Sequence, residues 1–355
     1  MKKTLIAVAA LAATGAFAQV SVYGRLDAGY AMTTNSVNGT DTKANGVQSH
    51  NSVSSMWGIQ GSEDLGGGLK ANFKLEQDVY LANGNTGTSG AAGGAAGSAA
   101  FNRTSLIGLS GGFGSLAFGR DYVPTFKLIA ATDVNSLSRI STVQLAAASG
   151  NSTTPNLVMY STPVMSGFQV NLAYGNQDTS AATDNTSKVT NLTATYTNGP
   201  LMVGVGQGTT EVKVAGAAAT PFTLTGTTVP AITNADKVTG QVLAASYNFG
   251  SFALKGNMIS SKGENATGSA TVSELNIGGT VPLGKVTLVA QLGTNKVKAD
   301  GAPEDWTGSD FVIGADYSLS AKTALFAKTG TYGKSSGNGD DIKSTSTAVG
   351  IKTVF

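Results

Sequence analysis

The segment VSVYGRLDAG, residues 20–29, alternates apolar and polar side chains with a period of two. Val20, Val22 and Leu26 fall on one face of an extended chain, and Arg25 and Asp27 fall on the other. Side chains two residues apart share a face of a strand, so this pattern predicts a β-strand. The alternation recurs at 69–76, 168–174, 252–258, 275–281, 286–292 and 311–317. We therefore expect an all-β fold.

The composition excludes several classes of site. The 355 residues include 47 Gly, and 12% are charged, against about 25% in ordinary soluble domains. The absence of Cys excludes disulfide scaffolds, Cys-ligated metal centres and thiol nucleophiles. His50 is the single histidine, so one chain cannot supply a cluster of His ligands. We expect no metal or other cofactor.

Residues 1–18 have the pattern of a signal peptide. Lys2 and Lys3 form a basic start, an apolar stretch follows, and residues 16–18 read Ala-Phe-Ala, a small-x-small cleavage site. We expect residues 19–355 to form one barrel domain. Without the two lysines the net charge is (23−2)−21 = 0, which suggests no nucleic-acid-binding surface.

The connections between the predicted strands are of two kinds. Short ones lie around 63–68, 111–114, 161–163, 198–200, 248–250, 282–284 and 318–321, and long polar ones lie near 33–50 and about 79–100, 121–154, 175–188, 207–237, 259–271, 293–310 and 332–344. Beyond residue 18 the sequence contains no run of about 18 consecutive apolar residues, so we expect no membrane-spanning helix. A closed β-barrel, however, can also span a membrane. Short periplasmic turns and long outer loops are typical of an outer-membrane barrel. Seven short turns, with both ends on their side, predict eight hairpins and 16 strands.

Aromatic residues fit this orientation. A tyrosine precedes four of the short turns, where a girdle at the membrane interface is expected: Tyr160, Tyr196, Tyr247 and Tyr317. Phe355 ends the chain on the same face as Val349 and Ile351. A terminal Phe on an alternating strand is similar to the assembly signal of bacterial outer-membrane barrels, which implies the barrel assembly machinery as a partner.

The long connection at 121–154 differs from the others. Most are rich in Gly, Ala, Ser and Thr, whereas this one carries Tyr122, Phe126, Leu128, Ile129, Leu137, Ile140, Val143 and Leu145. Apolar side chains at this density are not left in water. We expect this third loop to fold inward and pack inside the barrel wall.

Several motifs together resemble the trimeric general porins of Gram-negative bacteria, especially the β-proteobacterial branch. They are residues 20–29, the block WGIQGSEDLGGGLKA at 57–71, Arg103 with GLS at 108–110, FGR at 118–120, YSTP at 160–163 and Phe355. The resemblance implies a 16-stranded antiparallel transmembrane barrel in the outer membrane. It further implies a homotrimer that contacts membrane lipid and lipopolysaccharide, and a third loop that narrows the pore for ions and small solutes.

Five residues are candidates for the pore constriction. Charged side chains and diameter set selectivity in such pores, and an outward Arg would cost about 2–4 kcal/mol at the bilayer midplane. Arg25, on the polar face, and Arg103 match the basic positions of the family, and Asp133 resembles its acidic one. Lys74 and Glu76 share one strand face and are further lumen candidates. Alternatively, the two arginines brace the wall through ion pairs, and Asp133 caps a turn.

Two positions depart from the family pattern. Close relatives often have Arg where Met56 and Thr153 stand, and the loss of two cations should weaken the anion preference of this branch. Arg120, at the outer end of a strand, is interpreted mainly as an anchor for the loop or for a trimer contact. Arg139 adds positive charge in the third loop, but its direction does not follow from the sequence.

Passive diffusion of ions and small hydrophilic solutes is the favoured function. A barrel enzyme needs a base beside a nucleophile, and His50 lies in a predicted outer loop with no Gly-x-Ser-x-Gly context. A surface adhesin on a barrel platform would need aromatic or charged patches in its outer loops, whereas 83–100 is nearly all Gly, Ala, Ser, Thr and Asn. A substrate-specific channel would line its path with aromatic or basic ladders, which the sequence does not show.

Overall fold

The computed structural model describes residues 19–86, 100–144, 148, 152–178, 186–213, 236–266, 268–301, 304–336, 339 and 341–355. The predicted signal peptide lies outside these residues. The strands are β1 (Gln19–Val37), β2 (Thr40–Ser49), β3 (Met56–Gly66), β4 (Leu69–Asp78), β5 (Thr104–Gly111), β6 (Gly114–Tyr122), β7 (Thr153–Ser161), β8 (Phe168–Asp178), β9 (Thr186–Asn198), β10 (Leu201–Lys213), β11 (Lys237–Asn248), β12 (Ala253–Asn265), β13 (Gly268–Leu283), β14 (Val286–Ala299), β15 (Trp306–Ser318), β16 (Thr323–Ser336) and β17 (Asp341–Val354). The helix α2 (Pro124–Thr132) lies between β6 and β7. No described helix is long and apolar enough to cross a membrane.

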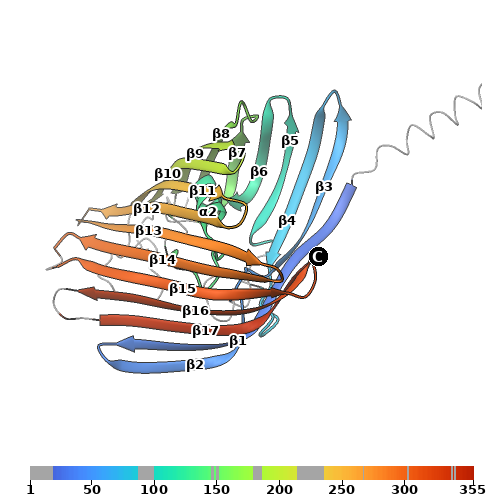
Figure 1. Cartoon of the computed structure of the whole chain (residues 1–355). Coiled ribbons are helices and arrows are strands. Elements are labelled where there is room, and N and C mark those ends of the chain that lie inside the picture. The colour runs from blue at the N-terminus through green and yellow to red at the C-terminus, as the bar shows by residue number, and fades with distance from the viewer. Residues whose placement is uncertain are drawn as a thin grey trace, which may run out of the picture.

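All strands belong to one antiparallel sheet, which closes on itself where β1 pairs with β17 (Figure 1). Both β2 and β3 pair with the same side of β1, one after the other, so they share one position in the wall. The seventeen segments therefore occupy sixteen positions. The predicted closed barrel of 16 antiparallel strands is confirmed.

The chain ends complete the seam of the barrel. The Phe355 amide donates to the Gly24 carbonyl oxygen at 3.0 Å, and the Gly24 amide donates to the Phe355 carbonyl oxygen at 3.1 Å. A Cβ at Gly24 would collide with the Phe355 ring and the Met56 carbonyl oxygen, so this position needs glycine. The last residue of the chain thus extends the ladder that joins the first and last strands.

The short turns lie where the sequence predicts them, but several predicted loops are wrong. The segment near 33–50 is not a loop: β1 and β2 continue through it and turn at Asn38 and Gly39. The segment at 259–271 is likewise a hairpin, which turns between Asn265 and Gly268. Polar strand ends have no apolar face to reveal them, yet their backbones still pair across the hairpin.

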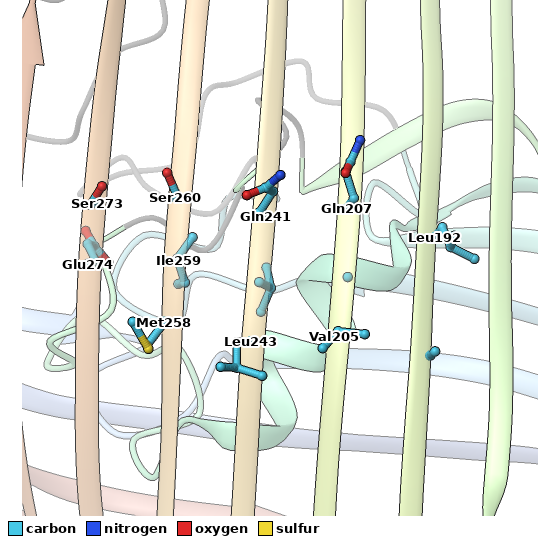
Figure 2. Close-up of a pocket in the computed structure, with 13 residues that line it drawn as sticks. Leu192, Val205, Gln207, Gln241, Leu243, Met258, Ile259, Ser260, Ser273 and Glu274 are labelled. Carbon is cyan, nitrogen blue, oxygen red and sulfur yellow. The ribbon is translucent and has the colours of Figure 1, made fainter.

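The outward face of the sheet is apolar and the inward face carries the polar residues. Figure 2 shows β9–β13 with α2 behind them, and a groove of about 560 Å³ lined by outward residues such as Leu243, Met258 and Val205. A polar row of Gln207, Gln241, Ser260 and Ser273 crosses this groove, since these residues are register partners. In Figure 2 this polar row lies above the apolar residues of the groove, so it marks the edge of the apolar band on these strands.

Aromatic residues gather near the short turns. The Tyr196 and Phe168 ring centroids lie 4.6 Å apart, and those of Tyr247 and Phe249 lie 4.5 Å apart. The Tyr160 hydroxyl donates to the Phe113 carbonyl oxygen at 2.7 Å. Amphipathic rings in this position suit the interface between membrane and water, as the sequence predicts.

Candidate pore constriction

The third loop lies inside the barrel, as predicted. It begins with α2, where Pro124 occupies the first turn and needs no hydrogen-bond acceptor for its nitrogen. Leu128 and Ile129 of α2 join one buried cluster with the inward residues Val242 and Ile259. Residues 145–147 and 149–151 lie outside the described residues. The apolar content of the loop therefore fills space against the wall.

Amide side chains of the wall hold this loop in register. The Thr125 amide donates to Asn191 Oδ1 at 2.9 Å, and Asn191 Nδ2 donates to Thr125 Oγ1 at 2.9 Å. Asn257 Nδ2 donates to Thr132 Oγ1 at 3.2 Å. These contacts come from β9 and β12, so the loop is fixed to separated strands by neutral hydrogen bonds.

The wall is also shaped to receive the loop. A Cβ at Gly204 of β10 would lie 2.7 Å from Leu128 Cδ1, and one at Gly206 would lie 3.0 Å from the Thr125 methyl carbon. A Cβ at Gly278 of β13 would approach the Val134 side chain in the same way. Inward glycines therefore provide the space that α2 and the following turn occupy.

Asp133 ends α2, and the structure buries it at 2% exposure. Its carboxylate accepts hydrogen bonds from the Asn135 amide at 3.1 Å, from Ser141 Oγ at 3.0 Å and from Gln291 Nε2 at 2.8 Å, and the Leu137 amide is a further donor. Asp133 thus caps a turn and ties the third loop to Gln291 of β14. Its contribution to ion selectivity stays a prediction.

Arg25 is an inward, partly exposed residue of β1. Its Nε donates to the Ser54 carbonyl oxygen at 2.8 Å. No carboxylate among the described residues forms an ion pair with it. Its positive charge is therefore not neutralised by direct pairing.

The remaining constriction candidates, Arg103, Lys74 and Glu76, form one network with Asp78 on β4 and just before β5. Arg103 Nη1 lies 2.6 Å from Asp78 Oδ1, and its Nε lies 3.7 Å from Glu76 Oε2. Lys74 Nζ lies 2.8 Å from Glu76 Oε1, which also accepts from Tyr23 at 2.8 Å. The network contains two cations and two carboxylates, so its charges cancel. Arg103, at 7% exposure, braces the inner wall here.

Lys255 and Arg139 are further cations at the third loop. Lys255 Nζ of β12 donates to the Ala131 carbonyl oxygen at 3.0 Å, near the C-terminal end of α2, where a cation is favourable. The sequence analysis did not single out Lys255. Its alternation with Leu254 and Gly256 indicates the polar face, but only the structure reveals its contact with the loop. Arg139 has an exposed side chain, and its amide donates to the His50 carbonyl oxygen at 2.8 Å. Neither residue forms an ion pair within the described residues.

Two other residues singled out by the sequence have structural contacts. Arg120 donates from Nε to the Asn102 carbonyl oxygen at 2.6 Å and from Nη2 to Thr153 Oγ1 at 2.8 Å, which anchors the base of the loop. His50, which the sequence places in an outer loop, is buried rather than exposed to solvent. It is 5% exposed, its ring stacks on Tyr80 with centroids 4.5 Å apart, and Nε2 lies 3.1 Å from the Val79 carbonyl oxygen.

Comparisons with known proteins agree with this architecture. The family model described as Gram-negative porin matches residues 4–338. Outer membrane porin protein 32 of Delftia acidovorans is 32% identical over 300 residues, which are 81% of this chain and 77% of that protein. An outer membrane porin protein of Bordetella pertussis is 31% identical over 58% of each chain. The solved anion-selective porin from Comamonas acidovorans has a TM-score of 0.76 at 23% identity and covers 96% of this chain and 100% of its own. The chain belongs to the Gram-negative porin family and is a diffusion channel of the outer membrane.

Proposed function

We propose that the narrowest part of this diffusion channel lies between the third loop and the wall around Arg25. The observation that carries the proposal is the fixation of the loop to the opposite wall, by Asn191 and Asn257 at two separated strands. A loop held in this way reduces the open cross-section at its own level. Ions and small hydrophilic solutes then pass through water between the loop and β1.

We further propose a preference for anions. Arg25 and Lys255 beside the third loop, and Arg139 within it, carry positive charge without an ion pair in the described chain. Arg103, Lys74 and Glu76 contribute less to the net potential because their charges are paired. Asp133 keeps its charge, but at 2% exposure it is buried away from the water of the pore. Unneutralised charge at a constriction attracts counter-ions and repels ions of like charge.

The test is the reversal potential of purified protein in planar bilayers under a salt gradient. Arg25→Gln and Lys255→Gln should each lower the anion-to-cation permeability ratio about threefold, the effect of one unit charge about 7 Å from the ion path with screening in 0.1 M salt. Lys285→Gln, at a short turn, is the control and should change little. Unchanged ratios in both test variants would refute the proposed constriction.

A substrate-specific channel and a surface adhesin, the alternatives weighed from the sequence, would behave differently from a general diffusion channel in the same assays. The first predicts conductance that one solute class blocks at low concentration, and the second predicts surface binding without conductance. Hydrolysis of an ester or peptide that disappears in His50→Ala would instead indicate a barrel enzyme. Large, ohmic single-channel conductance without selective block supports the general pore.

We also propose the assembly expected from the family, a homotrimer surrounded by membrane lipid and lipopolysaccharide and inserted by the barrel assembly machinery through Phe355. The exposed apolar side chains of the outer wall, among them Val20, Val22 and Ile351, supply surface for lipid or for a second copy. A heat-resistant trimer band in unheated gels is the expected result. Monomer alone after mild extraction would contradict it.

A further inference from the structure

An irregular segment interrupts the wall beside Arg25. On β1, Arg25 pairs with Met56 and Ala28 pairs with Ser49. Two residues of β1 therefore lie opposite six, residues 50–55, which connect β2 to β3. His50 begins this segment with a left-handed backbone, φ 66°, which a non-glycine residue rarely adopts. Six residues that leave the sheet here need other partners for their amides.

Asp27 supplies the partner for three of these six amides. Its side chain is fully buried on the inward face of β1, and its carboxylate accepts from the amides of Asn51 at 3.1 Å, Ser52 at 2.6 Å and Val53 at 2.9 Å. Ser55 Oγ accepts from the Asp27 amide at 2.8 Å and donates to the Asp27 carbonyl oxygen at 3.0 Å. Three consecutive amides around one carboxylate are strong, charge-assisted hydrogen bonds.

The segment that Asp27 fixes contacts the pore residues on several sides. The Ser54 carbonyl oxygen accepts from Arg25 Nε at 2.8 Å. The His50 carbonyl oxygen accepts from the amide of Arg139 in the third loop at 2.8 Å. Ser52 Oγ lies 3.1 Å from Lys352 Nζ of β17. Residues 50–55 thus connect the wall cation, the loop and the last strand.

We infer that Asp27 is a positioning residue for the constriction, which holds residues 50–55 so that Arg25 and the third loop keep their places. The inference rests on the proposed function, because it assigns Asp27 an effect on selectivity through Arg25. Asp27 itself is shielded from the lumen by the segment that it binds. Its role is therefore mechanical, although it carries a charge.

The direction in which ion selectivity changes distinguishes a mechanical role of Asp27 from a direct effect of its charge. Removal of a negative charge from the inner wall should by itself raise the preference for anions. Release of Arg25 from its fixed place should lower it. Asp27→Asn should therefore lower the anion-to-cation permeability ratio in planar bilayers, against the direction of its charge.

Asp310→Asn is the matched control. Asp310 is also a buried inward carboxylate, at 4% exposure, and it accepts from the Gly333 amide and from Asn295, far from residues 50–55 in the register. This variant removes the same charge without touching the segment. Its permeability ratio should stay unchanged or rise.

Hydrogen exchange supplies a readout independent of Arg25. An Asn side chain has one acceptor oxygen and places donors against the amides of residues 51–53, so peptides covering 50–55 and 135–141 should exchange about tenfold faster in Asp27→Asn. Ser55→Ala, which removes two hydrogen bonds and no charge, should act in the same direction. This second variant serves if Asp27→Asn fails to assemble.

The outcomes are distinct for the two proposals. A shift of the ratio in Arg25→Gln, with unchanged ratio and exchange in Asp27→Asn and Ser55→Ala, would overturn the positioning role and leave the constriction intact. Unchanged ratios in both Arg25→Gln and Lys255→Gln, with faster exchange in both Asp27→Asn and Ser55→Ala, would refute the constriction but support the mechanical role. A rise of the ratio in Asp27→Asn equal to that in Asp310→Asn would show a charge effect alone and overturn the inference.

Discussion

The inward cations of the pore wall differ in how far their charge is cancelled by a neighbouring carboxylate. Arg103, Glu76 and Lys74 pair with one another or with a neighbouring carboxylate, so they stabilise the wall and largely cancel in the lumen. Arg25 and Lys255 hydrogen-bond only to carbonyl oxygens in the described chain, so their charge acts on passing ions. The pairing of a charge, rather than its presence, decides its effect on selectivity.

Asp133→Ala is predicted to loosen the third loop. The carboxylate accepts from two loop amides, from Ser141 and from Gln291, and the loss of a charged acceptor for such donors costs about 1–3 kcal/mol. Single-channel recordings should show larger open-channel noise. Asp41→Ala, in the exposed β1–β2 hairpin, is the control. A pure shift of ion selectivity with quiet channels would contradict the capping role.

Alternation along the strands predicted the inward direction of Arg25, Lys74 and Glu76, because parity follows directly from the sequence. The direction of Arg103 is ambiguous from alternation, because it is an even number of residues from the outward Ile107 and Leu109. It precedes the first residue of β5, however, and its side chain turns inward to Asp78. The burial of Asp133 was not predictable, because Gln291 lies 158 residues away along the chain.

At the scale of elements, the third loop and the wall are complementary in shape. Apolar content predicted that the loop packs inside, but the sequence does not show which of the 47 glycines receive it. Gly204 and Gly206 of β10 face α2, whereas Gly24 of β1 faces Phe355. The difference depends on strand register and on where the loop crosses the wall, and both are tertiary properties.

Gly204→Ala is predicted to displace α2 toward the pore axis. The new Cβ would lie 2.7 Å and 3.2 Å from the two Leu128 methyl carbons, and overpacking of this kind costs about 1–3 kcal/mol. Single-channel conductance should fall while the barrel still assembles. Gly333→Ala on β16 is the control, because its nearest neighbour would lie 3.8 Å away. Equal conductance in both variants would mean that the wall does not set the position of α2.

At the scale of the whole molecule, the barrel closes at one seam, where β1 pairs with β17. The sequence predicted sixteen strand positions from turn spacing, and also predicted apolar alternation up to Phe355. It did not predict the division of one position into β2 and β3, because residues 50–55 carry no breaker signal stronger than their polarity. A carboxylate on the neighbouring strand, Asp27, is what makes that interruption possible.

Deletion of Phe355 is predicted to slow closure of the barrel even without cellular machinery. It removes the two backbone hydrogen bonds with Gly24, worth about 1–3 kcal/mol together, and the ring that covers Gly24. Refolding of the urea-unfolded chain into detergent, followed by the mobility of unheated samples in gels, measures this directly. Phe355→Leu keeps both backbone bonds and should refold nearly as the parent protein does. If Phe355→Leu nevertheless fails to reach the outer membrane in cells, the aromatic ring is needed for recognition by the assembly machinery. Normal refolding of the deletion variant would instead mean that the seam closes without its last residue.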